Sequence, residues 1–197
     1  MSDILSDLAP DKPLSPGRYG AFPDAPAVKA VRLDLGLATL SAGRDVSALS
    51  RAIEAACGAP LPQGPTVAAG GAFSFIGIGP GRWTVAAESM SGEALLAKLE
   101  AAAGTNGSAC DQSDGSEVYE LSGARVREAL MKMLEIDIDP AVFKTGSAAV
   151  TRAASIGVTV WQTSEAPVYR FQVARSYGLA FLRALAESAA EYGFEFV

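Results

Sequence analysis

The sequence predicts an α+β protein with two similar halves, in each of which helices pack on a mostly antiparallel sheet. Short apolar strands alternate with helical segments along the chain. The strands come in pairs joined by tight turns such as Pro80-Gly81, which is typical of antiparallel hairpins. The order of hairpin and helix over residues 73–99 recurs about 80 to 90 residues later, over 157–185, which indicates a duplicated unit.

The chain divides into an arm and two halves. We expect an extended N-terminal arm over residues 1–27, a first α+β half over 28–104 and a second over 105–197, the two halves forming one compact unit. Five prolines fall within the arm, and proline removes a backbone donor and restricts the preceding residue. The segment Gly104–Ser108 consists of Gly, Thr, Asn and Ser, and we expect it to be the loop between the halves.

Apolar spacing and turn residues locate the individual elements. Asp45 or Ser47 can cap the first helix, and Gly58 ends it. In the first half we expect a strand from residue 28 to 35 that continues or pairs through 37–40, a helix ending before Gly58, strands at 72–79 and 82–87, and a helix at 91–103. In the second half we expect a strand at 118–121, a helix at 124–134, a connector at 135–146, strands at 158–162 and 168–173, a helix at 176–191 and a strand at 194–197.

Composition excludes several classes of function. Hydrophobic residues make up 49% of the chain, which allows a sizeable core. The net charge is −6 and the 16 Lys and Arg residues are scattered, so we expect no nucleic-acid partner, because phosphate binding needs clustered positive charge. The sequence contains no histidine, which removes the usual general base near neutral pH and the usual transition-metal ligand.

The cysteines and the N-terminus bear on location. Cys57 and Cys110 lie far apart and complete neither a zinc site nor a disulfide framework, so we expect no metal site. Residues 1–14 carry three aspartates and no apolar run, unlike a signal peptide. No segment approaches the roughly 20 apolar residues of a membrane span. We therefore expect a cytoplasmic protein that does not enter a membrane.

Three segments resemble sites, and each has a structural interpretation that we favour. The run Gly77–Arg82 lacks the spacing of a phosphate-binding loop and leads into a strand, so it is predicted to be a hairpin turn. Asp111, Ser113 and Asp114 beside Cys110 carry acid–base and nucleophilic groups, yet Asp and Ser are also common turn residues. Alternating acidic residues over 135–139 lack the glycine and distal glutamate of a calcium loop, and we expect a solvated edge.

Aromatic residues are the candidates for a partner interface. Tyr19 and Phe22 in the arm and Tyr177 at the start of the last helix are predicted to contact a partner, because Tyr and Trp are frequent in interface hot spots. Packing of the arm on its own domain is an equal alternative for the first two. Trp83 and Trp161 both lie in predicted strands, and burial in the core is at least as plausible for them. No catalytic, cofactor-binding or metal-binding residue is predicted.

Several motifs resemble those of the sarcosine oxidase gamma-subunit family. The quoted segments run Cys110-Asp-Gln-Ser-Asp-Gly115, Tyr119-Glu-Leu-Ser-Gly-Ala-Arg-Val-Arg-Glu-Ala-Leu130, Ile136-Asp-Ile-Asp-Pro-Ala-Val-Phe143, Gly157-Val-Thr-Val-Trp161, Tyr169-Arg-Phe-Gln-Val173, Arg175-Ser-Tyr-Gly178 and Ala189-Ala-Glu-Tyr-Gly-Phe194, with Pro16-Gly-Arg-Tyr-Gly20 and Gly79-Pro-Gly-Arg-Trp83 in the first half. The resemblance covers nearly the whole chain, and its second half is the more specific part.

The resemblance implies a fold and a role. That family is similar in fold to the folate-binding domains of aminomethyltransferases, the glycine-cleavage T-proteins. In those transferases an Asp-x-Ser pattern lies just before the strand and the glycine of the first matched motif, as Asp111, Ser113 and Gly123 do here. In those transferases an acidic motif that contacts folate lies at the strand near Gly157, and residues 154–157 of this chain, which occupy that place, contain no carboxylate. A carboxylate recognises the adjacent N–H donors of a pterin, so its absence argues against folate chemistry in this chain.

The resemblance also implies partners. It implies alpha, beta and delta subunits that carry FAD, FMN, NAD and zinc, with no cofactor on this chain, in a complex that converts sarcosine to glycine, passes the one-carbon unit to tetrahydrofolate and forms peroxide. The leading hypothesis is therefore a non-catalytic gamma subunit. The alternative is a free-standing folate-binding or aminomethyltransferase-like protein. A third hypothesis is a subunit of an oxidase for another N-methyl amine.

Overall fold

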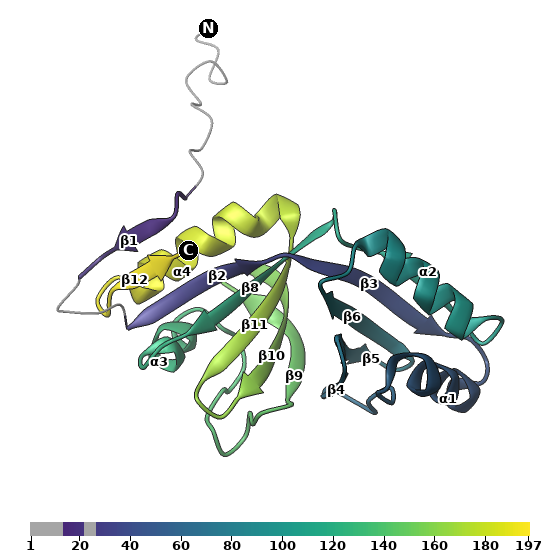
Figure 1. The fold of residues 1–197 in the computed structure, drawn as a ribbon. Coiled ribbons are helices and arrows are strands. Elements are labelled where there is room, and N and C mark those ends of the chain that lie inside the picture. The colour runs from purple at the N-terminus through teal and green to yellow at the C-terminus, as the bar shows by residue number, and fades with distance from the viewer. Residues whose placement is uncertain (1–13, 22–26) are drawn as a thin grey trace, which may run out of the picture.

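Two β-sheets lie side by side in the computed structural model, which describes residues 14–21 and 27–197 (Figure 1). The seven-stranded sheet has the order β1 (Gly17–Tyr19), β12 (Phe194–Phe196), β2 (Val28–Leu33), β8 (Ser116–Ser122), β11 (Val168–Ala174), β10 (Ile156–Ser164), β9 (Ala148–Ala153). The five-stranded sheet has the order β4 (Val67–Gly70), β5 (Phe73–Gly79), β6 (Arg82–Glu88), β3 (Leu35–Ala42), β7 (Gly107–Asp111). All pairings are antiparallel except that of β12 with β2.

Helices cover each sheet, as Figure 1 shows. The helices are α1 (Val46–Cys57) and α2 (Gly92–Ala103) on the five-stranded sheet, and α3 (Val126–Met131) and α4 (Gly178–Ala189) on the seven-stranded sheet, with a short 3-10 turn η2 (Arg175–Tyr177) before α4. The predicted α+β class with two sheets is thereby confirmed. The order hairpin then helix recurs as β5, β6, α2 and as β10, β11, α4.

Local sequence explains why the helices form where they do. The side chain of Asp45 accepts a hydrogen bond from the backbone N–H of Ala48 at 2.8 Å, which caps α1. Leu49, Ile53 and Cys57 recur every four residues and form the buried face of α1. Gly58 follows with φ of 77°, a left-handed conformation that glycine adopts without steric cost.

The sheets do not follow the predicted sequence halves 28–104 and 105–197. β2 belongs to the first half but lies in the seven-stranded sheet, and β7 belongs to the second half but lies in the five-stranded sheet. The chain passes between the sheets at Asp34 and again over residues 112–115. Hydrophobic periodicity shows that a strand exists but not which strand it pairs with. The sequence therefore did not predict that β2 and β7 each lie in the sheet formed mainly by the other half.

Four of the strands in the described residues were missed, and all four lie at sheet edges. They are β1, which falls in the predicted arm, and β4, β7 and β9; many of their side chains are exposed or half-buried, so they lack the alternation that predicts a strand. The predicted loop 104–108 therefore ends in a strand that begins at Gly107. The predicted helix 124–134 is also shorter, because α3 occupies only Val126–Met131.

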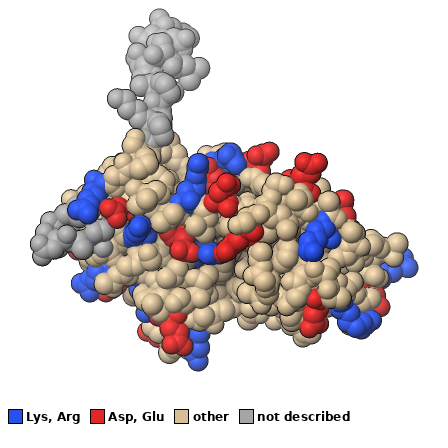
Figure 2. Space-filling model, in the orientation of Figure 1, with Lys and Arg blue, Asp and Glu red and all other residues tan. Residues whose placement is uncertain are grey.

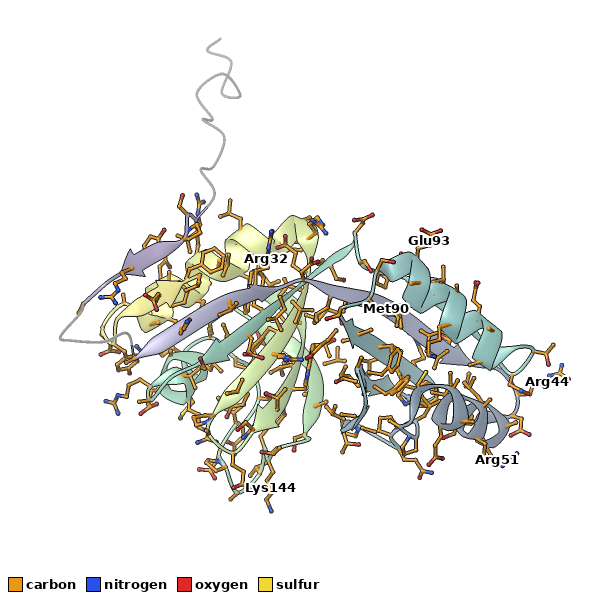
Figure 3. The ribbon with its side chains drawn as sticks, in the orientation of Figure 1. Arg32, Arg44, Arg51, Met90, Glu93 and Lys144 are labelled. Atoms are coloured by element: carbon orange, nitrogen blue, oxygen red, sulfur yellow. The ribbon has the colours of Figure 1, made fainter. Side chains whose placement is uncertain are left out.

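Two apolar cores stabilise the sheets and a third joins them. One lies between the seven-stranded sheet and α3 and α4, and the second lies between the five-stranded sheet and α1 and α2. Met90, labelled in Figure 3, is partly buried and packs against the second core. The third cluster lies between the sheets and consists of Leu37, Ile76, Ala86, Val118, Ala148 and Trp161. Its members come from both sheets, so apolar burial holds the two sheets together.

Polar contacts supplement this third core. The hydroxyl of Thr84 on β6 donates to Oε1 of Gln172 on β11 at 3.0 Å. The Arg170 guanidinium on β11 contacts Glu120 at 2.8 Å in its own sheet and Glu88 at 3.3 Å in the other. Arg170 is largely buried, so these charge-assisted contacts fix the position of one sheet against the other.

The second crossing of the chain is held by Ser113. Its hydroxyl accepts from the Leu37 N–H at 3.0 Å and lies 3.3 Å from the Leu37 carbonyl, to which it donates. The Gln112 N–H also donates to the Leu37 carbonyl, at 2.8 Å. Arg175 closes the turn from the other side, because its guanidinium donates to the backbone carbonyls of Ser113 and Asp114. The turn is therefore fixed to β3 and to the segment before α4.

We predict that Trp161→Ala lowers the free energy of unfolding by about 3–5 kcal/mol, because it leaves a cavity between the sheets. Trp161 is 1% exposed and belongs to the third core. Urea denaturation measures this free energy. The variant Trp161→Phe is expected to lose clearly less free energy of unfolding, because an aromatic ring still fills part of the space. A loss below about 1 kcal/mol for the alanine variant would show that the sheets do not depend on this contact.

We predict that Ser113→Ala lowers the free energy of unfolding by about 1–3 kcal/mol, because it leaves the Leu37 N–H without its acceptor and leaves Gln112 as the remaining donor to the Leu37 carbonyl. The matched control is Ser108→Ala, whose side chain is exposed on β7 and whose loss is expected to stay within about 0.5 kcal/mol. Urea denaturation of both variants gives the comparison. Equal losses would contradict a specific role for Ser113.

Candidate functional site

The glycine-rich run from Gly77 to Arg82 forms the β5–β6 hairpin, which confirms the prediction of a turn. Gly81 has φ of 65°, and its carbonyl accepts from the Ala42 N–H at 2.8 Å. The strands pair with a register shift between Gly77 and Gly79. The run therefore leads from strand to strand, and its backbone takes part in the hydrogen bonds of the sheet.

Asp111 and Ser113 are held together at the turn that leads from β7 to β8. Oδ1 of Asp111 accepts from the Ser113 N–H at 2.8 Å, and this bond is the main cause that lowers the pKa of the Asp111 carboxyl. Both side chains lie against Gly92 at the start of α2, where an added Cβ would come within 2.2 Å of the Ser113 oxygen. Cys110 is exposed on β7, and its sulfur lies 3.6 Å from Nε2 of Gln112. The favoured interpretation as turn residues agrees with this geometry.

The acidic side chains of segment 135–139 bind to neighbouring groups of the same chain. Asp137 accepts from the backbone N–H of Asp139, and Asp139 accepts from that of Ala141, each at 2.8 Å. Glu135 forms an ion pair with Arg152 at 2.9 Å. Across residues 14–21 and 27–197, no three His, Cys, Asp or Glu side chains gather where they could hold a metal ion.

The predicted interface aromatics are not brought together. Tyr19 on β1 packs on the Phe194 ring with centroids 6.2 Å apart. The chain after it meets the end of α4, where Ala21 N–H donates to the Ala190 carbonyl. Tyr177 lies at the opposite end of α4 and is 55% exposed. Phe22 lies outside the described residues. Trp83 and Trp161 are both buried, at 4% and 1% exposure.

Charged side chains of both signs intermingle on the face of the molecule in Figure 2. Arg44 and Arg51 lie at the α1 end in Figure 3, and Glu93 lies at the start of α2. A polar cavity of about 320 Å³ is lined by Arg32, which forms an ion pair with Glu117, and by Arg175, which lies 4.0 Å from Asp114. Glu117 there accepts from the Tyr119 hydroxyl, and burial raises the pKa of that tyrosine.

An apolar groove of about 630 Å³ lies where α1, the β5–β6 hairpin and β9 approach one another. The groove consists of Val46, Pro62, Gln63, Gly64, Pro65, Gly77, Ile78, Gly79, Pro80, Gly81, Trp83 and Val150, and no member carries a charge. Val46 and Val150 are 45% and 60% exposed. The Trp83 indole is held in place because its N–H donates to the Pro62 carbonyl at 2.9 Å. An uncharged groove with exposed valines is a surface suited to an apolar partner.

A second cavity, of about 480 Å³, lies beside β10 on the seven-stranded sheet and has both polar and apolar walls. Its lining is Arg127, Pro140, Phe143, Lys144, Thr145, Gln162 and Glu165. Gln162 is only 3% exposed, and its Oε1 atom has no hydrogen-bond partner. A buried amide oxygen without a partner is uncommon in a folded protein and calls for an explanation.

Sequence inspection found neither the groove nor this cavity. The groove is assembled from segments far apart in the chain, and each segment alone looks like an ordinary turn or strand end. Gln162 did carry a signal, because it is a polar residue that follows Val158 and Val160 at the alternate positions of one strand face. In a strand with buried faces, that position is where a polar group needs a partner.

None of the helices in the described part of the chain is both long and apolar enough to span a membrane. Comparison with known proteins agrees with the fold. Among curated protein sequences, none matches the chain. Among solved structures, the chain is similar to the heterotetrameric sarcosine oxidase from Corynebacterium sp. U-96 in complex with pyrrole 2-carboxylate, with 27% identity, a TM-score of 0.77 and coverage of 88% of both chains.

An enzyme with lower sequence identity has a similar fold. The glycine cleavage system aminomethyltransferase T from Bartonella henselae shares it with 14% identity and a TM-score of 0.63, over 87% of this chain and 48% of that one. Residues 42–191 match the SoxG family, described as the sarcosine oxidase, gamma subunit family. That match spans most of the chain, including α1 to α4 and the strand crossing at Ser113. The protein therefore belongs to the sarcosine oxidase gamma subunit family.

Proposed function

We propose that this chain is a non-catalytic gamma subunit of a heterotetrameric sarcosine oxidase and assembles with alpha, beta and delta subunits. The observation that carries the proposal is the similarity to the Corynebacterium heterotetrameric enzyme over 88% of both chains, together with membership of the gamma family.

In this proposal the chemistry belongs to the other subunits. They carry FAD, FMN, NAD and zinc, oxidise sarcosine to glycine, transfer the one-carbon unit to tetrahydrofolate and form peroxide. The gamma chain supplies surfaces that bind the other subunits. A cytoplasmic location is part of the same proposal and is compatible with the free thiols of Cys57 and Cys110.

Two features favour a role without catalysis in this chain. The sequence has no histidine, so the commonest proton-transfer group near neutral pH is missing. The Asp111 and Ser113 side chains, which offered the best acid–base and hydroxyl pair, are engaged with backbone groups at the strand crossing. The Ser113 hydroxyl, the only hydroxyl nucleophile of the two, is held between the N–H and the carbonyl of Leu37, which favours a structural role for it.

The apolar groove is the surface we assign to the larger subunits. It is uncharged, and it presents exposed Val46 and Val150 beside the rigid turn Gly79–Gly81. Burial of such side chains against an apolar segment of a partner removes nonpolar surface from water, which is the main driving force for a stable interface. The occupant is therefore an apolar segment of another subunit of the complex.

The second candidate function is folate binding or aminomethyl transfer by this chain alone. It is favoured by the fold shared with aminomethyltransferase T. The segment where the resemblance places an acidic motif speaks against it. Ala154 and Ser155 form the tight β9–β10 turn with φ of 47° and 67°, and neither supplies a carboxylate for a pterin.

We predict that Val150→Asp reduces recovery of the larger subunits by at least about tenfold, because a charge in the groove would be buried without a partner. The measurement is a pull-down from cells that co-express the tagged chain with the alpha, beta and delta subunits. The matched control is Val142→Asp, since Val142 is also an exposed valine, at 64%, but lies outside the groove. Equal recovery with both variants would rule out the groove, and failure of the wild-type chain to capture any subunit would overturn the proposed function.

We predict that tetrahydrofolate produces no saturable heat when titrated into the purified full-length chain at ligand concentrations up to about 1 mM, which covers weak binding. The reason is the missing carboxylate at Ala154 and Ser155. Isothermal titration calorimetry makes the measurement, and an authentic aminomethyltransferase serves as the positive control. Saturable one-to-one heat would favour the second candidate function.

A further inference from the structure

The outer edge of β9 carries backbone groups that point away from its sheet. β9 ends the seven-stranded sheet, so β10 pairs with one of its sides and the other side is an edge. Figure 1 shows this edge turned toward the five-stranded sheet. In an antiparallel pair, alternate residues exchange hydrogen bonds with the partner strand, and the residues between them direct their N–H and C=O groups outward.

Two contacts identify the outward residues of β9. At one end, the Ala148 N–H donates to the Pro65 carbonyl at 2.9 Å. At the other end, the Arg152 carbonyl accepts from the Glu135 N–H at 3.0 Å. Because residues 148 and 152 both point outward, the alternation places the backbone groups of Val150, midway between them, on the same edge.

Four successive backbone groups lie between these two contacts. They are the Ala148 carbonyl, the N–H and the carbonyl of Val150, and the Arg152 N–H. Within residues 14–21 and 27–197, none of the four has a backbone hydrogen-bond partner. Thr66 and Leu134 form isolated bridges with the two ends of β9, so the chain covers both ends of the edge and leaves its middle open. An open edge is a template for another strand.

The open part of the edge borders the apolar groove. The Val150 side chain lines the groove and is 60% exposed. Ala148 shares a face of β9 with Val150, and it belongs to the core between the sheets together with Ile76 of β5. This face of β9 is therefore the one directed toward the five-stranded sheet. One segment lying along β9 can pair with the edge and also place a side chain in the groove.

β7 is a second edge strand with outward backbone groups, and it differs from β9 in its side chains. Its exposed residues are Ser108, Cys110 and Asp111. A charged residue is one of the devices that protect an edge from pairing, whereas an exposed β-branched apolar residue such as Val150 favours it. The β9 edge is therefore the better template for a partner strand.

We propose that the subunit segment in the groove is an extended, uncharged strand that pairs with β9 at Val150. The inference rests on the proposed function and adds the mode of recognition. One apolar residue of the segment exchanges two hydrogen bonds with the Val150 backbone. Its side chain lies beside that of Val150, because directly opposite residues of paired strands share a face. The main-chain bonds supply affinity, and the groove selects apolar side chains.

The chemistry of the edge and of the groove excludes other kinds of occupant. A helix pairs its own backbone groups and offers few to the β9 edge, so it would leave the Val150 N–H and carbonyl unpaired on burial. A charged segment would be buried against a lining that carries no charge. An extended apolar segment has neither disadvantage.

The first experiment compares amide hydrogen exchange, resolved by residue, in the purified chain and in the complex from cells that co-express the alpha, beta and delta subunits. We expect the Val150 and Arg152 amides to exchange at least about tenfold more slowly in the complex. The control is the Ala109 amide on β7, whose exchange is expected to stay unchanged. Unprotected Val150 and Arg152 amides in an assembled complex would overturn the inference, as would equal protection of Ala109.

The second experiment removes one outward donor. Arg152→Pro loses the N–H, whereas the matched control Arg152→Ala loses the same ion pair with Glu135 but keeps the N–H. Both variants are expected to fold, because proline is tolerated on an edge strand where its N–H would face outward. We expect Arg152→Pro to recover at least about fivefold less of the larger subunits than Arg152→Ala in the pull-down.

The outcomes separate this inference from the proposed function. Equal recovery with Arg152→Pro and Arg152→Ala would contradict strand pairing while the assembly role stands. A wild-type chain that captures no subunit would overturn the assembly role itself. If urea denaturation shows that Arg152→Pro does not fold, the hydrogen exchange of the wild-type complex decides alone.

Discussion

The structure depends on the contact between the two sheets, where Trp161, Ile76 and their neighbours form a small apolar core. Each sheet has its own helices and its own larger core, so neither needs the other for its internal packing. What obliges them to lie together is that the chain passes from one sheet to the other twice, at Asp34 and over residues 112–115. The third core buries the apolar faces that these crossings bring near one another, which gives a reason for one fixed arrangement.

The hydrogen bonds of Ser113 follow from the same constraint. A chain that changes sheets leaves backbone groups without strand partners, and buried groups of this kind must find others. Ser113 and Gln112 bind the Leu37 backbone, and Arg175 binds the turn carbonyls. The Asp-x-Ser pattern that looked like chemistry is thus explained by the topology. Residues that resemble a catalytic pair are used to close a crossing between sheets.

The surfaces with functional interest arise at the borders of this arrangement. The apolar groove forms where β9 of one sheet approaches α1 and the β5–β6 hairpin of the other. The cavity at Gln162 forms where β10 ends and the connector with Phe143 folds back over it. One is uncharged and the other is charged with an unsatisfied acceptor, so they fit different kinds of partner.

The sequence by itself determined the α+β class, the positions of the main helices and hairpins, and the Asp45 cap and Gly58 end of α1, because these depend on local periodicity and on turn and cap chemistry. It also predicted the turn at Gly77–Arg82 and the resemblance to the gamma family, which the family match confirms. Only the tertiary structure decided the exchange of β2 and β7, the edge strands β4 and β9, the groove around Val46 and Val150, and the unpaired oxygen of Gln162. These features depend on which distant segments meet, and neither hydrophobic spacing nor local propensity carries that information.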